Sequence, residues 1–190
     1  MVDSLSFAFQ TLLDLWHDIR KSETPAGETV AVPTRAAFDP MSLGKLLPHV
    51  HLLEFHGTDR LVFRLSGTAE VRRLGEDPKG QDYFALIDMA SAGYLRRHMH
   101  RILFYPAGVL VDTRETYPDG SHIPTRFLAL PLRDAAAGRD YVIAMVEVSG
   151  RTTLGTAPFF DQQQETTWSD RIIGIQGYDL GCGIPKVQPY

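Results

Sequence analysis

The first apolar pattern in the chain has the period of a helix. Between residues 4 and 20, large apolar side chains recur at offsets of three and four, which places them on one stripe of a helix with Asp3 or Ser4 as its N-cap. The stripe consists of Leu5, Phe9, Leu12, Trp16 and Ile19. It is longer than one sheet face needs to bury. It therefore predicts either an interface with a second copy of the chain or a cover for the protein's own sheet.

The pattern then changes to the alternation that is typical of strands. A loop over residues 22–33 comes first, followed by a helix that starts at Asp39 and Pro40 and ends by Leu47. Asp88 is the expected cap of a longer helix, and the sequence YPDG at residues 117–120 predicts a hairpin turn between strands three and four. The predicted strands are 50–56, 61–66, 108–117, 122–132 and 140–149, with helices near 69–74 and 89–104.

The strands differ in how many of their faces are apolar. Strands one, four and five are apolar on both faces, so both faces of the sheet must be covered. Charged residues interrupt strand two at Arg64 and strand three at Asp112, Arg114 and Glu115, which suits strands at sheet edges. Pro131 has no N–H to donate, so we expect it at a strand end or a bulge.

The segment Leu61–Ile87 joins several of these elements in a distinctive order. A half-apolar strand runs into Gly67 and a one-turn helix, Gly75 stops that helix, and Gly80 opens an aromatic segment. This order resembles the opening of a PAS domain, a sensory and protein-interaction module. Within that superfamily it resembles the bacterial subfamily in which the domain makes up nearly the whole protein.

The resemblance covers roughly residues 35–150 and implies an α+β fold. The implied fold is a five-stranded antiparallel sheet in the order 2-1-5-4-3, with helices on its concave face and an N-terminal amphipathic helix. Three parts of the chain follow from it: a helix and linker over 1–34, the PAS-like domain over 35–150, and a tail over 151–190. The tail is polar and then glycine-rich, so we expect at most a short ordered piece in it.

Charge and composition narrow the classes of function. The net charge is −4, and the nearest approach to a basic cluster, Arg96, Arg97 and Arg101, suits the wet face of a helix, so nucleic acid is not an expected partner. Cys182 is the single cysteine, which excludes an intramolecular disulfide and a cysteine-based zinc site. No apolar run approaches the ~20 residues of a membrane span, and the start at Asp3 does not read as a secretory signal. We expect a cytoplasmic protein.

The chain carries none of the common catalytic motifs, such as G-x-S-x-G, H-E-x-x-H or a phosphate-binding glycine loop. We therefore expect no enzyme. The alternative is a small enzyme on a curved sheet that uses Asp112, His122 or Tyr117 as acid–base groups.

The histidines raise metal and haem hypotheses. His49 and His51 share one face of a strand, but their spacing implies no third ligand, so we expect a structural role and no metal. Haem-binding PAS domains ligate iron with a histidine from the helix before the third strand, which makes His98 or His100 the candidate. We expect no cofactor and keep haem as the lesser alternative. The flavin-binding photosensors use a cysteine in the short-helix region, and this chain has none there.

The resemblance implies a non-catalytic signalling module that senses a small molecule, docks on a signalling partner, or does both. It also implies a cavity between the sheet and the helices of 69–104, unless large side chains fill that space as a packed core. The expected wall of the cavity is Phe63, Arg64, Leu74, Tyr83, Phe84, Tyr94, His98 and Arg126. Arg64 and Arg126 either cap the cavity and bind an acidic ligand, or reach water or pair with a carboxylate such as Asp112 or Glu115. PAS-like domains often dimerise through an N-terminal helix, so we expect a homodimer through the apolar stripe.

Overall fold

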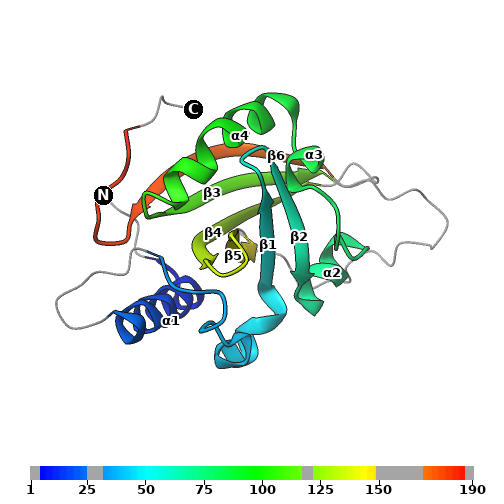
Figure 1. Cartoon of the computed structure of the whole chain (residues 1–190). Coiled ribbons are helices and arrows are strands. Elements are labelled where there is room, and N and C mark those ends of the chain that lie inside the picture. Colours follow the sequence, from blue (N-terminus) through cyan, green and yellow to red (C-terminus); the bar gives the residue numbers. More distant parts are fainter. Residues whose placement is uncertain (1–4, 25–31, 117–121, 149–168, 187–190) are drawn as a thin grey trace.

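One antiparallel sheet of six strands organises the protein (Figure 1). The computed structural model describes residues 5–24, 32–116, 122–148 and 169–186. The strand order is β2-β1-β5-β4-β3-β6, so the predicted order 2-1-5-4-3 is confirmed. The strands are β1 Val50–His56, β2 Arg60–Ser66, β3 Ala107–Thr116, β4 His122–Asp134, β5 Arg139–Val148 and β6 Ser169–Asp179. The helices are α1 Phe7–Glu23, the 3-10 helix η1 Pro40–His49, α2 Thr68–Leu74, α3 Tyr83–Leu86 and α4 Met89–Leu103.

The sixth strand corrects two expectations. β6 pairs antiparallel with β3 over Ser169–Asp179, so a sheet of five strands was one strand too few, and this part of the chain is not a tail. Strand three is also not an edge, because β4 and β6 flank it. Beyond β6, the main-chain oxygen of Leu180 accepts a hydrogen bond from Arg20 Nη1 at 2.7 Å. The end of the sheet is thereby tied to the end of α1.

Helices cover both faces of the sheet, as the doubly apolar strands predict. One face, which we call the α4 face, packs against α3 and α4 and holds a core that includes Phe63, Phe84 and Leu95. The opposite face, which we call the α1 face, packs against α1 and η1 around Val50, Leu130 and Met145. Figure 1 shows α4 and α1 on opposite sides of the curved sheet.

The apolar stripe of α1 packs on the protein's own sheet. Phe9, Leu12, Trp16 and Ile19 are all buried within the single chain, and Leu5 packs against the same core. The expectation of a dimer interface through this stripe is therefore wrong for this arrangement, because these side chains are already covered. The helix also begins later than expected. Its N-cap is Ser6, whose hydroxyl accepts from Phe9 N, and not Asp3 or Ser4.

The structure confirms the predicted start of α4 and the predicted end of α2. Asp88 caps α4 by accepting from Ala90 N and Ser91 N, both at 3.1 Å. Gly75 ends α2 with a φ of 82°, the left-handed value that favours glycine. The helix that Asp39 caps differs from the expectation. It consists of 3-10 turns that are interrupted by a kink at Gly44, where φ is 51°, and it runs past Leu47 to His49, where Val50 N donates to the oxygen of Leu47.

The position of Pro131 differs from the prediction, whereas the pairing of β3 with β4 agrees with it. Pro131 lies inside β4, opposite Val142, and not at a strand end or bulge. Its missing N–H is tolerated because the β3–β4 ladder ends at the pair Val109–Ala129, before the proline. β3 and β4 pair as the predicted hairpin does, while the expected turn at 117–120 lies outside the described residues.

Candidate functional site

A cavity of about 40 Å³ lies on the α4 face, between the sheet and helices α2, α3 and α4. A water molecule needs about 10–15 Å³ of such space, so the cavity has room for roughly three waters. Most of its wall is apolar, and three polar residues, His51, Arg73 and Glu115, line it as well. The apolar wall consists of Leu53, Leu61, Phe63, Leu74, Tyr83, Leu95, Met99, Val111, Phe127, Ala129, Val142 and Ala144.

Three residues of the predicted wall lie at this cavity. Phe63, Leu74 and Tyr83 line it. Phe84 does not, because its ring is buried in the neighbouring core on the α4 face, where the guanidinium of Arg96 lies 5.9 Å from its centre. The residues expected in the wall but absent from it are Arg64, Phe84, Tyr94, His98 and Arg126.

Both predicted arginines make ion pairs elsewhere. Arg64 Nε lies 2.8 Å from an oxygen of Glu54, and the arginine side chain is 44% exposed. Arg126 Nε donates to Asp112 at 2.6 Å across the β3–β4 pair. Neither arginine caps the cavity. The alternative, that each snorkels to water or pairs with a carboxylate, is what the structure shows, with Asp112 as the partner of Arg126.

A different arginine supplies the guanidinium of the cavity. Arg73 lies on α2, three residues after Glu70, and its Nε donates to that carboxylate at 2.9 Å. Its Nη1 donates to Glu115 near the end of β3, so a single guanidinium bridges two carboxylates from separate elements. Glu70 and Glu115 are almost fully buried, with exposures of 2% and 1%. We call Glu70, Arg73 and Glu115 the buried triad.

Hydroxyl groups extend the triad along the sheet. Thr125 Oγ1 donates to Glu115 at 3.5 Å, and it shares a 2.6 Å hydrogen bond with Thr113 on the neighbouring strand. Both threonines are buried. A buried carboxylate without partners carries a large desolvation cost, and these donors reduce it.

His51 completes the polar end of the cavity. Its Nδ1 lies 2.8 Å from the hydroxyl of Ser66, and its Nε2 lies 3.8 Å from Glu70. Burial, and after it the positive charge of Arg73, lowers the pKa of His51 from 6.5 to about 3. The imidazole is therefore neutral at neutral pH. Of these groups, Glu115, Arg73 and His51 line the cavity, whereas Glu70 does not and has His49 Nδ1 3.3 Å from its Oε1.

Sequence reasoning missed the triad although its signals are present. Glu70 and Arg73 stand at i and i+3 of a seven-residue helix, a spacing at which side chains meet on a helix. The same spacing is usual on wet helix surfaces, so burial is visible only once β3 is placed beside α2. Glu115 was interpreted as an edge charge, and it is buried because β6 makes β3 an inner strand.

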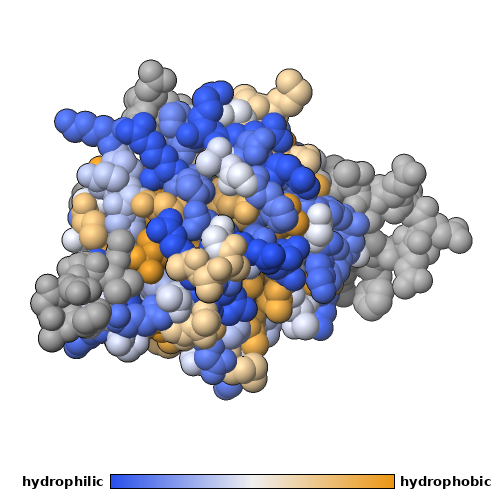
Figure 2. Space-filling model, in the orientation of Figure 1, coloured by the Kyte–Doolittle hydropathy of each residue, from blue (hydrophilic) through white to orange (hydrophobic). Residues whose placement is uncertain are grey.

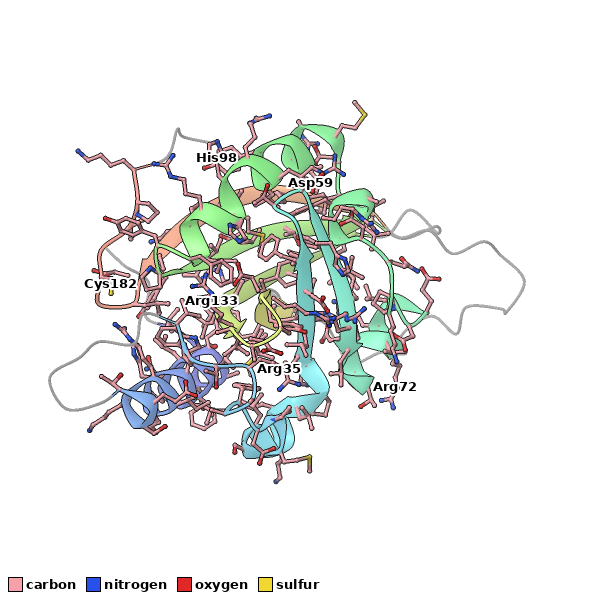
Figure 3. The ribbon with its side chains drawn as sticks, in the orientation of Figure 1. Arg35, Asp59, Arg72, His98, Arg133 and Cys182 are labelled. Carbon is pink, nitrogen blue, oxygen red and sulfur yellow. The ribbon has the colours of Figure 1, made fainter. Side chains whose placement is uncertain are left out.

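The two haem candidates lie away from the cavity wall. His98, labelled on α4 in Figure 3, packs its ring 4.7 Å from that of Tyr94, and its pKa is lowered by burial and by Arg97 and Arg101. The Nε2 of His100 lies 2.8 Å from Asp140. Neither histidine lines the cavity, and a space of about 40 Å³ is too small for a macrocycle. The haem alternative does not fit these residues.

The remaining candidates for chemistry are not part of the cavity. Among the described residues, no group of three or more His, Cys, Asp or Glu side chains could hold a metal ion. Cys182 is exposed, and its sulfur lies 3.4 Å from Arg20 Nη2. None of the helices in the described part of the chain is long and apolar enough to cross a membrane.

Comparison with known families identifies the kind of domain to which this fold belongs. The family model described as PAS domain matches residues 5–146, which is most of the chain. The protein therefore belongs to the PAS domain family. The matched range ends at residue 146, so β6 lies outside the matched residues. A search of the curated proteins found no match.

Proposed function

We propose that the protein is a non-catalytic PAS sensory module that binds a small molecule in the cavity on the α4 face and passes its occupancy to a signalling partner. The observation that carries the proposal is the cavity itself: an apolar space with a few convergent polar groups at one end. Small-molecule sites have this composition. The proposed domain limits are 35–150 for the sensory unit, with α1 and β6 as extensions that complete its two faces.

The enzyme alternative gains no support from the geometry. Asp112 is paired with Arg126, and His122 is exposed and bonds to the hydroxyl of Thr116. Neither residue lines the cavity. Tyr117, the third acid–base candidate, lies outside the described residues.

The position of α2 supports a route from the cavity to the opposite face. Arg73 and Leu74 of α2 line the cavity, while Gly67 at the start of α2 lies directly against the main chain of Pro48 in η1. η1 in turn packs with α1 on the α1 face. A ligand that moves α2 would therefore push on η1, because a close backbone contact leaves no space to absorb the movement.

Partner binding and self-association are further parts of the proposal. The α1 stripe is covered, so any interface has to use other side chains. Among the residues that the structure describes, Phe7 and Met89 are the most exposed large apolar ones, at 83% and 91%. On the face in Figure 2, apolar residues form small patches between hydrophilic side chains, which suits a transient partner better than a permanent one. We place the protein in the cytoplasm.

The test compares the unmodified protein with a variant whose cavity is filled. Ala144→Leu adds three carbons to a residue of the cavity wall, and Ala90→Leu makes the same change at an exposed position of α4. Thermal unfolding is followed with a panel of fragments of up to about four heavy atoms, which is what a cavity of about 40 Å³ can hold. A ligand at 100 times its Kd adds about 2.7 kcal/mol, or roughly 5–10 °C in Tm for a protein of this size.

We expect at least one fragment to raise the Tm of the unmodified protein and of Ala90→Leu, but not that of Ala144→Leu. Mass spectrometry of an extract from the same three proteins identifies any ligand that is already bound. If every stabilising fragment acts equally on Ala144→Leu, the cavity is not the binding site and the proposal fails.

A further inference from the structure

The polar residues of the cavity wall are held by hydrogen bonds within the protein. The Nδ1 of His51 lies 2.8 Å from the hydroxyl of Ser66. Arg73 donates from Nη1 to Glu115, and Glu115 also accepts from Thr125 Oγ1 at 3.5 Å. Hydrogen bonds of this kind lower the cost of burying a polar group. The polar end of the wall is therefore compensated without a ligand.

Unpaired polar atoms lie elsewhere in the protein. Within the described ranges, the buried side-chain atoms that lack a hydrogen bond are Oε2 of Glu54, which has an ion pair with Arg64, and Nδ1 of His98. Neither Glu54 nor His98 lines the cavity. A polar ligand gains from a buried site by pairing with such atoms, because they have lost their bonds to water. This cavity offers a polar ligand little of that gain.

Two alanines near the centre of the sheet leave the space open. Ala129 on β4 and Ala144 on β5 are paired directly across the two strands, and both line the cavity. Each has only a methyl group, whereas most of the remaining wall consists of larger side chains, among them Leu95 and Met99 of α4. The cavity is thus bounded by small methyl groups on the sheet and by long apolar side chains on α4.

A space with such a wall favours an apolar occupant. Wall atoms beside an empty space lose dispersion contacts, and an apolar molecule restores those contacts without breaking a hydrogen bond. For this reason apolar cavities stay dry and take up hydrocarbons or xenon. A charged or hydroxylated molecule would instead give up its hydrogen bonds with water, a cost that is recovered only where the site supplies new partners.

We propose that the ligand of this cavity is a small uncharged hydrocarbon, which lies against the methyl groups of Ala129 and Ala144 and contacts Met99 of α4. This inference rests on the proposed function, since it assumes that the cavity takes a ligand. The volume of about 40 Å³ limits that ligand to at most about four heavy atoms. Propane is the matching probe, and xenon is a second apolar probe. The best affinity per atom that small ligands reach puts the Kd of propane at about 0.5 mM or weaker.

The experiment follows single methyl groups by NMR in the full chain, labelled at alanine and methionine. Propane and xenon are applied under gas pressure, and ethanol, which has as many heavy atoms as propane, is titrated over the same concentrations. We expect saturable shifts of the Ala129, Ala144 and Met99 methyl signals with both gases. Met89 and Ala90, which are exposed on the same helix as Met99, are internal controls and should not shift. Ethanol should need at least a tenfold higher concentration for half-saturation.

Variants that fill the cavity test where the gases bind. Ala144→Leu should abolish the shifts of the Ala129 and Met99 methyl signals, because the added carbons occupy the space. Ala90→Leu makes the same change outside the cavity wall and should leave the half-saturating concentration of propane unchanged. If Ala144→Leu does not fold, Ala129→Val is the second variant. It enlarges the paired alanine by less and should raise that concentration at least tenfold.

The outcomes separate this inference from the proposed function. Ethanol that binds as tightly as propane, with shifts that Ala144→Leu abolishes, would overturn the hydrocarbon assignment and leave the sensory cavity standing. Propane shifts that persist in Ala144→Leu would overturn the assignment as well, because the gas would then bind elsewhere. Unchanged Ala129, Ala144 and Met99 signals under both gases would also overturn it, whereas the proposed function fails only if the wider fragment panel gives no response that depends on the cavity.

Discussion

The indole Nε1 of Trp16 donates a hydrogen bond to the main-chain oxygen of Pro131 at 2.7 Å, and both residues are buried. The bond joins α1 to β4 across 115 positions of the sequence. The carbonyl that it satisfies belongs to a stretch of β4 beyond the end of the β3–β4 ladder. Trp16 therefore acts as a fixed part of this fold.

The first prediction follows from that bond. Trp16→Phe keeps an aromatic ring but removes the donor, and leaving the oxygen of Pro131 without it should lower the free energy of unfolding by about 1–3 kcal/mol. Trp16→Ala also opens a cavity and should cost about 3–5 kcal/mol. Urea unfolding measures both. If Trp16 instead served a dimer interface, the substitutions would change the molar mass from light scattering with little loss of stability in the monomer.

The second prediction tests β6 with two neighbouring residues of the same type. The side chain of Ile172 is buried in the core on the α4 face, whereas Ile173 is 55% exposed. Ile172→Ala should lower the free energy of unfolding by about 2–4 kcal/mol, and Ile173→Ala by less than about 0.5 kcal/mol. Equal effects in urea unfolding would contradict the packing of this strand against the core.

The sequence determines much of this fold because its central strands are apolar on both faces. That pattern requires two covering layers and a central position, so strands one, five and four could be placed before any contact was known. The sequence did not predict β6, because Gly174 and Gly177 interrupt its apolar pattern. A strand with glycines resembles a loop unless the neighbouring strand it completes is already in place.

The candidate site was predicted less well than the fold. Phe63, Leu74 and Tyr83 were found because apolar side chains reach the core from any strand or helix that faces it. For Arg64 and Arg126 the sequence left two roles open, a cap on the cavity or a contact with water or a carboxylate, because a charge within an apolar strand does not reveal what lies across from it. In the structure Arg64 forms an ion pair with Glu54, and Arg126 forms one with Asp112. The guanidinium that does reach the cavity, that of Arg73, comes from a helix whose buried side cannot be told from its pattern.

The third prediction concerns the contact between α2 and η1. A Cβ at Gly67 would lie 2.2 Å from the main-chain oxygen of Pro48, a distance that requires the backbone to move. Gly67→Ala should therefore destabilise the protein by several kcal/mol, about the range of an overpacked core. Gly93→Ala in α4 is the matched control. Its Cβ would meet only the end of the Arg97 side chain at 3.5 Å, and it should raise stability by up to about 1 kcal/mol through helix propensity.

Both glycine variants are compared by urea unfolding. The same two proteins also test the proposed coupling, because α2 carries Arg73 and Leu74 into the cavity. A fragment that binds the cavity should bind Gly67→Ala more weakly and Gly93→Ala unchanged. A loss of stability in Gly67→Ala without any change in binding would show that the contact is structural only.

The last prediction is a pH dependence of stability that originates at His51. Burial and Arg73 lower its pKa in the folded protein to about 3, against 6.5 for the ordinary group. Above pH 6.5 the imidazole is neutral in both states and contributes no pH dependence. As the pH falls from 6.5 towards 3, the unfolded chain binds a proton that the folded protein does not, so the free energy of unfolding decreases. The slope is at most about 1.4 kcal/mol per pH unit.

Urea unfolding between pH 7.5 and 4.5 measures that slope. His51→Gln keeps a group that can bond to Ser66 but does not titrate in this range. Below pH 6 it should therefore reduce the slope of the free energy of unfolding by up to about 1.4 kcal/mol per pH unit, the contribution of one proton. His56→Gln, at a side chain that is 43% exposed, is the matched control and should change the slope less. His17 and His98, whose pKa values burial also lowers, contribute in the same direction and remain in both variants. A slope that is unaltered in His51→Gln would mean that the imidazole binds its proton alike in the folded and the unfolded protein, which would contradict the lowered pKa of the buried group.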